Sequence, residues 1–456
     1  MWLHALRVVR PRQAAARATR PLRRRRFPGG PPGSFRPLTE NELLWRSPAF
    51  APSGSAPDAG SRLAAFERHY GDDVLEAART GRDPAALATA WAAAHPPRAD
   101  DAWHPYAAST RVTNWIAAAS LDPSLAPVLA DGTRRALARV AANIEDDVLG
   151  NHVIRNAVSL VLGGVAFGDR TLRRRGEALL ARELPEQVLA DGGHYERSPA
   201  YHRLVLRDLL TVHAYADVER TIEQMLDFAA ASSRPDGAPW LFNDGGLDIA
   251  PTLELAAPTD GVRVFPETGY VFVRRGGLAL AFDCGPVSPP FLPAHAHADG
   301  LSFQLWLHGE PVVVDPGMPT YEPGAERDVF RSTQAHSTVA VGGSQFESWG
   351  AFRAGPLPQV ELVEANENGA TGRVVTARGE HRRRITVEPD AVVVEDETRG
   401  ADAVSTLVLA GEADVEAAVE PATQTAVLAE RLGERRPIRA LVQRGAPSPT
   451  WRIRAR

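Results

Sequence analysis

The sequence predicts a multidomain protein with a helical N-terminal half and an antiparallel β-sandwich as its C-terminal half. A chain of 456 residues exceeds the size at which one hydrophobic core usually keeps growing, so two domains are expected. Apolar residues recur at three-and-four spacing from about residue 41 to 257, which is the period of amphipathic helices. The pattern then changes to alternation and β-branched runs. The predicted domains are therefore 41–260 and 261–456, after a basic segment at 1–40.

The helical half contains segments such as "SRLAAFERHYGDDVLEAART", "NHVIRNAVSLVLGGVAFG" and "RTLRRRGEALLARELPEQVL". Gly150, Gly168 and Pro235 are among the residues that punctuate their joins. Helical hairpins of this size without a fixed sequence period are typical of an α/α toroid or helical array, and equally of an ordinary bundle.

The second half reads as short strands, for example "YVFVRRGGLALAFDCG", "LSFQLWLHGEPVVVD" and "RRRITVEPDAVVVEDETRG". Gly, Pro, Asp and Asn turns separate them, which is typical of an antiparallel sandwich. The pattern does not place the strands beyond about residue 411.

Composition narrows the possible functions. The net charge of -5 gives no overall attraction to nucleic acid, so no nucleic-acid partner is expected. All 51 basic residues are arginines, which excludes lysine Schiff-base chemistry and lysine phosphate loops. The single cysteine, Cys284, excludes an intrachain disulfide and a multi-cysteine metal cage.

Residues 1–40 are rich in arginine and read as a basic, disordered tail or an over-extended start. No apolar region follows the charges, and no run elsewhere is long enough for stable insertion in a bilayer. We therefore expect a cytoplasmic protein, or a periplasmic or cell-envelope protein if the start is misassigned. The oligomeric state is not predicted.

The stretch "PAHAHADGLSFQLWLHGEPVVVDPG" is the strongest candidate for chemistry in the second half. In an extended segment, side chains two apart point to the same side, so His295, His297 and Asp299 can face a common space. Asp315 follows a valine run and His336 precedes another strand. Two imidazoles and a carboxylate from such a cluster are a plausible zinc set with water as the fourth ligand.

A second candidate group lies in the helical half. Asn151 and His152 follow Gly150 at a predicted helix start, where Asn is also a common N-cap. The stretch "DGGHYERSPAYH" concentrates polar and aromatic side chains before another helix, which Ser198 and Pro199 would begin. Such bunching is unusual for a purely structural loop.

These motifs together resemble the heparinase II/III family of polysaccharide lyases. The resemblance rests on "NHVIRNAVSLVLGGVAFGD", "ADGGHYERSPAYH", "HAHADGLSFQLWLHGEPVVVDPGMPTY" and "RDVFRSTQAHSTVAVGGSQFESW", in the family's order. It implies an (α/α) toroid followed by a β-sandwich, an acidic polysaccharide or oligosaccharide as substrate, and β-elimination as the reaction. It also implies a structural Zn²⁺.

Carried over by position, the family's catalytic residues fall on Asn151, His152, Tyr201 and His295, and its zinc ligands on His297, Asp315 and His336. Elimination removes the C5 proton of a uronate, which is weakly acidic until the neighbouring carboxylate is neutralised. Asn151 and His152 would stabilise the charge that develops there. Tyr201 and His295 would be the base and acid, with the order left open.

Further residues are weaker candidates for binding substrate: Arg111, Asn114, Tyr195, Glu196 and His202. We expect Arg327 and Arg331 to be surface arginines. We expect the loop at Asn243 and Asp244 to be a turn. Asp299 is expected to support its loop. Ser337 stands where the family has asparagine.

Two other functions are compatible with these residues. A zinc-dependent glycan hydrolase would use the His/Asp cluster for hydrolysis. A non-catalytic glycan-binding protein of a polysaccharide biosynthesis system would bind the glycan and would not cleave it. An unsaturated uronate product, which absorbs ultraviolet light, separates the lyase from both.

Overall fold

The computed structural model describes residues 8–26, 28–38, 61–249, 253–445 and 448–454. The chain divides into two compact units, each described separately below. The helical unit consists of residues 9–187 and 204–223, and the sheet unit mainly of 188–203 and 224 onward. A helical region followed by antiparallel sheets confirms the predicted fold class.

Residues 188–203 and 224–260, which the sequence pattern assigned to the helical domain, belong to the sheet unit. The physical reason is an aromatic cluster. Phe228 and Phe242 pack with Tyr270, Phe272 and other side chains on one face of the main sheet. The boundary between the units therefore passes through two helices, α10 and α11, instead of a linker near residue 260.

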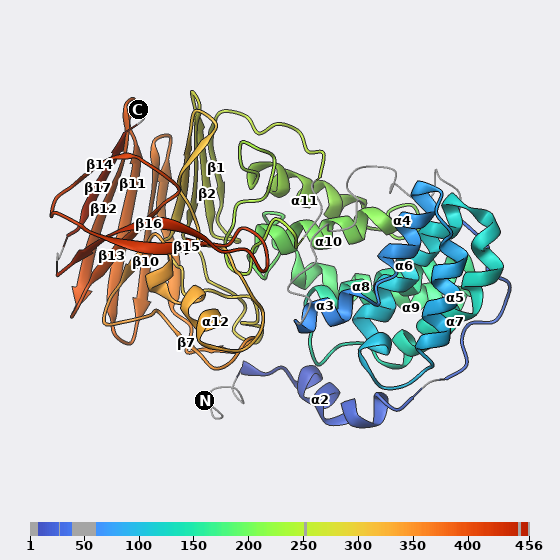
Figure 1. Cartoon of the computed structure of the whole chain (residues 1–456). Coiled ribbons are helices and arrows are strands. Elements are labelled where there is room, and N and C mark those ends of the chain that lie inside the picture. The colour runs from blue at the N-terminus through green and yellow to red at the C-terminus, as the bar shows by residue number, and fades with distance from the viewer. Residues whose placement is uncertain (1–7, 27, 39–60, 250–252, 446–447, 455–456) are drawn as a thin grey trace. The chain divides into compact units, whose positions relative to one another are not determined.

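Helix α8 packs against α9, which follows it in the chain, and against α6, which lies two helices before it (Figure 1). Helix α8 is the centre of the helical unit, because nearly all of its residues are buried. The helical segments are α2 (Pro11–Arg23), α3 (Arg62–Glu67), α4 (Asp72–Thr80), α5 (Pro84–Ala94), η4 (Asp101–Trp103), α6 (Pro105–Leu121), η5 (Pro123–Leu125), α7 (Ala126–Ala142), α8 (Asn151–Ala166), α9 (Arg170–Gln187), α10 (Pro199–Val212), α11 (Glu219–Ala231), α12 (Ala325–Phe330) and η6 (Thr333–Ala335).

Helix α2 corrects the prediction that residues 1–40 form a disordered tail. Its arginines are paired: Arg12 contacts Glu183 at 2.9 Å, and Arg20 contacts Asp147 at 2.9 Å. Arg139 also donates to backbone carbonyls just beyond the helix, including that of Arg24 at 2.8 Å. The basic run is ordered because acidic partners lie far along the chain, where no local pattern shows them. Residues 1–7 and 39–40 lie outside the described part.

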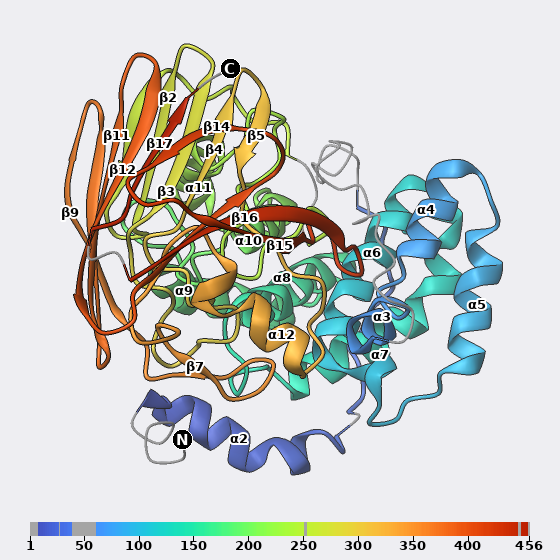
Figure 2. The same cartoon turned by 60° about the vertical axis from the view of Figure 1, so that its left-hand side comes forward.

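In the described part of the sheet unit, two antiparallel sheets contain nine and six strands, and a hairpin contains two (Figures 1 and 2). The nine-stranded sheet has the order β1-β2-β3-β4-β5-β13-β16-β15 with β6 beside β13, and the six-stranded sheet the order β14-β17-β12-β11-β10-β9. The strands are β1 (Gly261–Phe265), β2 (Tyr270–Arg275), β3 (Leu278–Asp283), β4 (Phe303–Leu307), β5 (Glu310–Val313), β6 (Val339–Ala340), β7 (Glu347–Ser348), β8 (Ala354–Gly355), β9 (Gln359–Asn366), β10 (Gly369–Thr376), β11 (Gly379–Val387), β12 (Ala391–Gly400), β13 (Val404–Leu409), β14 (Asp414–Ala417), β15 (Ala422–Leu428), β16 (Arg436–Arg444) and β17 (Thr450–Arg454).

The main core lies between these two sheets. Phe282 and Phe303 of the larger sheet share it with Ile385, Val394 and Trp451 of the smaller one. Along β11 every second side chain from His381 to Val387 is buried and the side chains between them are more exposed, so one face of this strand lies against the interior. None of the helices in the described part of the chain combines the length and apolar character needed to cross a bilayer.

Candidate active site and metal centre

The loop between β3 and β4 carries the "HAHAD" motif, and buried polar side chains hold its backbone. Arg331 Nε donates to the carbonyl of Ala296 at 2.9 Å, and Thr333 donates to that of Ala298 at 2.7 Å. The side-chain amide of Gln345 both accepts from and donates to the backbone of Gly300. The loop is thus preorganised, which is the condition for precise placement of functional side chains.

Asp244 connects the two histidines of the motif. Its Oδ2 lies 2.8 Å from His295 Nδ1, and its Oδ1 lies 3.0 Å from His297 Nε2. The Arg327 guanidinium binds both oxygens of the same carboxylate, with one contact of 2.7 Å. Burial alone would raise the pKa of Asp244, but Arg327 and the hydrogen bonds from the two histidines hold it well below its usual range.

An ionised carboxylate only accepts hydrogen bonds, so Asp244 fixes the tautomer of each ring. His295 carries its proton on Nδ1, and its Nε2 is left with a lone pair. His297 carries its proton on Nε2, and its Nδ1 is left with a lone pair. The predicted turn at Asn243 and Asp244 is therefore the centre of the site, and Arg327 is a fully buried partner of it instead of a surface arginine.

Tyr201 lies at the start of α10, and its ring stacks on that of His295. The ring centres are 3.9 Å apart with an interplanar angle of 30°. The Tyr201 hydroxyl donates to the Tyr321 hydroxyl at 3.2 Å. Burial, with Tyr321 and Asp244 nearby, raises the pKa of Tyr201 well above its usual range, so the phenol carries its proton at neutral pH. The structure therefore brings together two residues that lie 94 positions apart in the sequence.

The backbone around this pair adopts conformations that side chains other than glycine rarely take. Arg197, Asn243 and Leu301 have φ angles of 55°, 59° and 64°. Asn243 stabilises its own turn, because its side chain accepts from His297 N at 2.8 Å and donates to the Arg197 carbonyl at 2.9 Å. Such strain is typical of functional sites.

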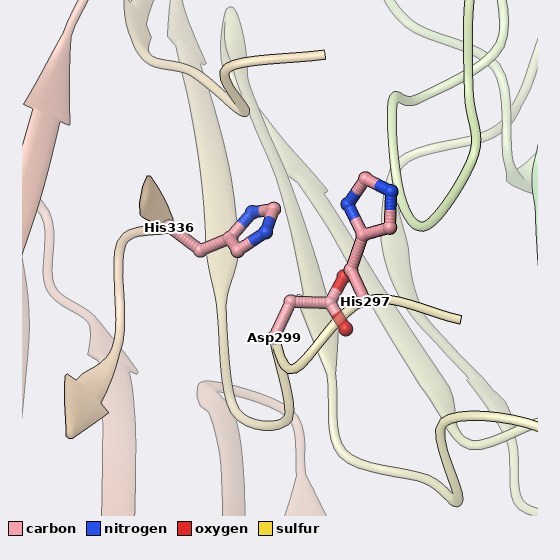
Figure 3. A group of neighbouring side chains, drawn as sticks. All are labelled: His297, Asp299 and His336. Carbon is pink, nitrogen blue, oxygen red and sulfur yellow. The ribbon is translucent and has the colours of Figure 1, made fainter. Parts of the chain in front are cut away.

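His297, Asp299 and His336 form a buried group that could hold a metal ion (Figure 3). One ligand atom from each lies within 4.8 Å of the others, and all three residues are fully buried. His297 Nδ1, Asp299 Oδ1 and His336 Nε2 have no hydrogen-bond partner among the described residues. Unsatisfied buried polar atoms are costly, and a cation bound by them would remove that cost. The donor set of two imidazoles and a carboxylate fits Zn²⁺.

The carboxylate of this group differs from the predicted one. Asp315, predicted as a ligand, lies with its Oδ2 2.7 Å from His336 Nδ1, and its other oxygen accepts from Gly317 N at 2.8 Å. Asp299, predicted as loop support, lies in the group instead. Each histidine thus has one nitrogen held by a carboxylate, as is usual for metal-binding histidines. Burial lowers the pKa of His297 to about 4, whereas the neighbouring Asp315 outweighs burial and raises the pKa of His336.

Asn151 and His152 are the first residues of α8 in the helical unit. Gly150 is the N-cap residue, so Asn151 is not the cap. Glu145 lies with Oε1 3.0 Å from His152 Nδ1, and its Oε2 accepts from Asn156 at 3.0 Å. Burial alone would raise the pKa of Glu145, but His152, His104 and these hydrogen bonds lower it to about 2. Glu145 therefore orients His152 as Asp244 orients His295.

Two of the predicted substrate-binding residues have structural partners in the helical unit. Arg111 is fully buried among three tryptophans and donates to the carbonyls of His69 and Ala102, each at 2.9 Å. Asn114 donates to the Tyr70 carbonyl and to Asp72. These contacts favour a role in packing over contact with a glycan.

The other three predicted substrate-binding residues are buried in the sheet unit. Tyr195 and Glu196 are each 3 % exposed, and His202 is 1 % exposed. His202 Nε2 bonds to the Met225 carbonyl at 2.9 Å, which ties α10 to α11. Burial lowers the pKa of His202 to about 3 despite that bond. The position of His202 favours a structural role.

Sequence reasoning missed Glu145 and Tyr321 and underrated Asp244 and Arg327. Glu145 follows a helix without any motif of its own, and Arg327 is one of 51 basic residues, so the sequence carried no sign of either partner. Asp244 stands in "FNDGG", which reads as a turn. Tyr321 ends the quoted "DPGMPTY" stretch and was the one residue with a local motif to find it by.

Comparison with known families covers both units. Residues 89–270 match the family described as "Heparinase II/III N-terminus", and residues 257–455 match "Heparinase II/III-like, C-terminal". Together the matches include Asn151, His152, Tyr201 and His295.

Two curated relatives match parts of the chain. The FtsZ-localized protein C of Caulobacter vibrioides is 27% identical over 289 residues, which is 56% of this chain and 49% of that protein. The heparin-sulfate lyase of Bacteroides stercoris is 23% identical over 237 residues, which is 42% of this chain and 35% of that protein. The chain thus aligns with about half or less of each relative's length.

Among solved structures, a heparinase III crystal structure superposes with a TM-score of 0.69 at 15% sequence identity. The match covers 88% of this chain and 78% of that one. At this identity the similarity establishes the fold.

Proposed function

Because the chain belongs to the heparinase II/III-like family, we propose that it is a polysaccharide lyase that cleaves an acidic, uronate-containing glycan by β-elimination. The product would carry a 4,5-unsaturated uronate at its new end. The observation that carries the proposal is the stacked pair of Tyr201 and His295, with Asp244 fixing the tautomer of the histidine.

The tautomer and the protonation state favour one division of labour within this pair. With Nδ1 turned to Asp244, His295 directs Nε2 away from that carboxylate, and in the neutral ring the Nε2 lone pair suits the base that removes the C5 proton. Tyr201 carries its proton, which suits the acid that protonates the departing glycosidic oxygen. The C5–H bond breaks as the C4–C5 double bond forms and the C4–O bond breaks, so the proton and the leaving group are both accounted for.

Asn151 and His152 are the proposed partners of the uronate carboxylate. A side-chain amide and an imidazole can donate hydrogen bonds to it and stabilise the negative charge that develops when the C5 proton leaves. Glu145 accepts from His152 Nδ1 and remains ionised far below neutral pH, so His152 directs its Nε2 to the substrate and donates there only as the imidazolium, with a proton on both nitrogens.

We propose Zn²⁺ as the ion of the group His297, Asp299 and His336, where its charge would tie the loop to the residues before β6 and act on the neighbouring site electrostatically. The full burial of all three residues favours a structural ion. It argues against the alternative of a zinc-dependent hydrolase, whose metal must reach the glycan.

The test is an ultraviolet-detected screen of the purified protein against heparan sulfate, chondroitin sulfate and alginate, as polymers and as oligosaccharides. We expect an unsaturated product from at least one of them, and loss of that product in Tyr201→Phe and His295→Ala proteins. Reducing ends that appear without ultraviolet absorbance would show hydrolysis and contradict the proposal.

A second candidate function comes from the Caulobacter relative, FtsZ-localized protein C, whose name associates it with FtsZ. We propose association with the division machinery as the alternative role, in which the fold is kept for recruitment or glycan binding. A fluorescent fusion that collects at the division site equally in wild-type and Tyr201→Phe forms, with no unsaturated product in the screen, would favour this role over the lyase.

A further inference from the structure

Phe352 is an exposed aromatic side chain beside the candidate acid/base pair. It is 47% exposed, whereas most phenylalanines of the sheet unit are buried. Its ring centre lies 6.2 Å from that of His295, at an interplanar angle of 75°, and 6.1 Å from that of Tyr321. Phe352 stands in the turn between β7 and β8, so the hairpin presents it next to His295.

Two buried arginines hold the backbone of this turn. Arg327 donates to the Ala351 carbonyl from Nε at 3.1 Å and from Nη2 at 2.9 Å. Arg331 donates to the carbonyls of Gly350 at 3.1 Å and Ala351 at 3.2 Å. Hydrogen bonds to charged donors are stronger than neutral ones, so the tip of the hairpin is fixed although its side chain faces solvent.

Arg327 also donates hydrogen bonds to Asp244, the carboxylate that orients His295. One side chain thus sets the position of the turn and of the acid/base pair together. The Phe352 side chain stays 47% exposed although the Arg327 guanidinium lies 5.5 Å from its ring centre and His295 and Tyr321 lie beside it. An aromatic ring that is exposed, rigidly presented and placed next to reactive groups is a feature of binding sites.

We propose that Phe352 is a stacking platform for a pyranose ring of the glycan, in the subsite next to the sugar that reaches His295. One face of a pyranose ring presents several C–H groups, which pack on the electron-rich face of an aromatic ring. The inference rests on the proposed function for the identity of the ligand and adds to it the residue that holds the neighbouring sugar.

A stacking platform contributes to substrate binding and not to the chemical step, so its effect on KM can be measured separately from any effect on kcat. In Phe352→Ala we expect KM to rise about 10-fold, because the apolar contact of part of a Phe side chain is lost, with kcat changed less than about twofold. Phe352→Trp keeps an aromatic face and should keep KM within about twofold. Val363→Ala is the matched control, because it removes an exposed apolar side chain from β9 in the other sheet, and should change neither constant.

The same variants are tested for binding without turnover. In the Tyr201→Phe background, isothermal titration with hexasaccharides of heparan sulfate and of alginate should show about 10-fold weaker binding once Phe352 is alanine. Because Phe352 is exposed, its alanine variant should unfold within a few degrees of the parent, so a folding defect is recognised directly.

The outcomes distinguish this inference from the proposed function. Cleavage by wild type with an unchanged KM in Phe352→Ala overturns the platform and leaves the lyase intact. Binding that depends on Phe352, with no unsaturated product from wild type, supports the platform and overturns the lyase. Absence of both binding and cleavage in wild type overturns both.

Discussion

At the scale of single residues, one carboxylate organises the candidate site. Asp244 accepts hydrogen bonds from His295 and His297 and forms an ion pair with Arg327. Its side chain is fully buried. It leaves the two histidines with lone pairs on different nitrogens, Nε2 in one and Nδ1 in the other. The two histidines of one short motif therefore turn different nitrogens away from Asp244.

The division of roles between Tyr201 and His295 can be tested with a substrate whose leaving group needs no proton. If Tyr201 is the acid, Tyr201→Phe should lose about 100-fold or more in kcat/KM on a glycan. It should recover most of that loss on a uronide that carries fluoride at C4. The measurement is the rate of unsaturated product formation on both substrates.

His295→Ala should stay inactive on the fluoride substrate, since removal of the C5 proton is still required. Recovery by His295→Ala and none by Tyr201→Phe would reverse the assignment of base and acid.

The metal group gives a second prediction at this scale. Asp299→Ala should abolish stoichiometric zinc, measured by elemental analysis of purified protein, because it removes a proposed ligand. Asp315→Asn should retain zinc with roughly 10–100-fold weaker affinity, because it disturbs only the carboxylate that orients His336. Full zinc in Asp299→Ala together with none in Asp315→Asn would restore Asp315 as the ligand.

At the scale of elements, the first turns of two helices carry three of the proposed catalytic side chains. Helix α8 begins with Asn151 and His152, and α10 begins two residues before Tyr201. The segment before α8 contains Glu145, whose backbone N–H donates to Asn156 Oδ1 at 3.0 Å while its carboxylate accepts from the same side chain. The helix and the preceding segment are thus locked together.

Because these hydrogen bonds hold His152 in position, we expect Glu145→Gln to lower kcat/KM by roughly 100-fold. Even a small displacement of a group that contacts the substrate slows the reaction strongly. Because the pKa of Glu145 is about 2, its carboxylate stays ionised and paired with His152 throughout the working pH range of the wild-type protein. Glu177→Gln is the control, since Glu177 pairs with Arg173 in a partly exposed i,i+4 contact on α9. A Glu145→Gln protein as active as the control would refute the orienting role.

At the scale of the whole molecule, the proposed reaction groups are divided between the two units. Asn151 and His152 belong to the helical unit, whereas Tyr201 and His295 belong to the sheet unit. The chain passes from one unit to the other within α10 and α11. Each unit thus supplies two of the four proposed groups.

Global stability provides a pH prediction through His202, which lies at the boundary in α10. Its folded pKa is about 3, against 6.5 for an ordinary histidine. Above pH 6.5 the group is neutral in both states and stability is at its full value. As the pH falls below 6.5, the unfolded chain takes up a proton that the folded chain does not, so stability falls until about pH 3.

At pH 5 this contribution amounts to about 2 kcal/mol of lost unfolding free energy. His202→Gln keeps a side-chain N–H for the Met225 carbonyl and removes the titrating group. Its urea-unfolding free energy should therefore decline less than that of wild type between pH 7 and 5. Parallel declines in the two proteins would contradict the buried, neutral state of His202.

The order of helices and strands was predictable because helical and strand periodicity are local properties of the chain. The residues of the short motifs were predictable for the same reason: His295, His297 and Asp299 lie within five positions and fold on one loop. The sheet unit reaches back beyond the predicted boundary because Phe228 and Phe242 are helical or loop-like in pattern, while their packing partners are strands further along. The arginines of α2 were read as a solvated tail because their acidic partners are more than 100 residues away.

The sequence by itself therefore determined the succession of a helical and a β region, the two motif-bearing loops, and the types of side chain available for acid, base and metal chemistry. Only the tertiary structure decided which carboxylate serves which histidine: Asp244 for His295 and His297, Asp315 for His336, and Glu145 for His152. A carboxylate acquires such a role from the donors that fold against it and from its removal from water, and neither property is present in the local order of residues.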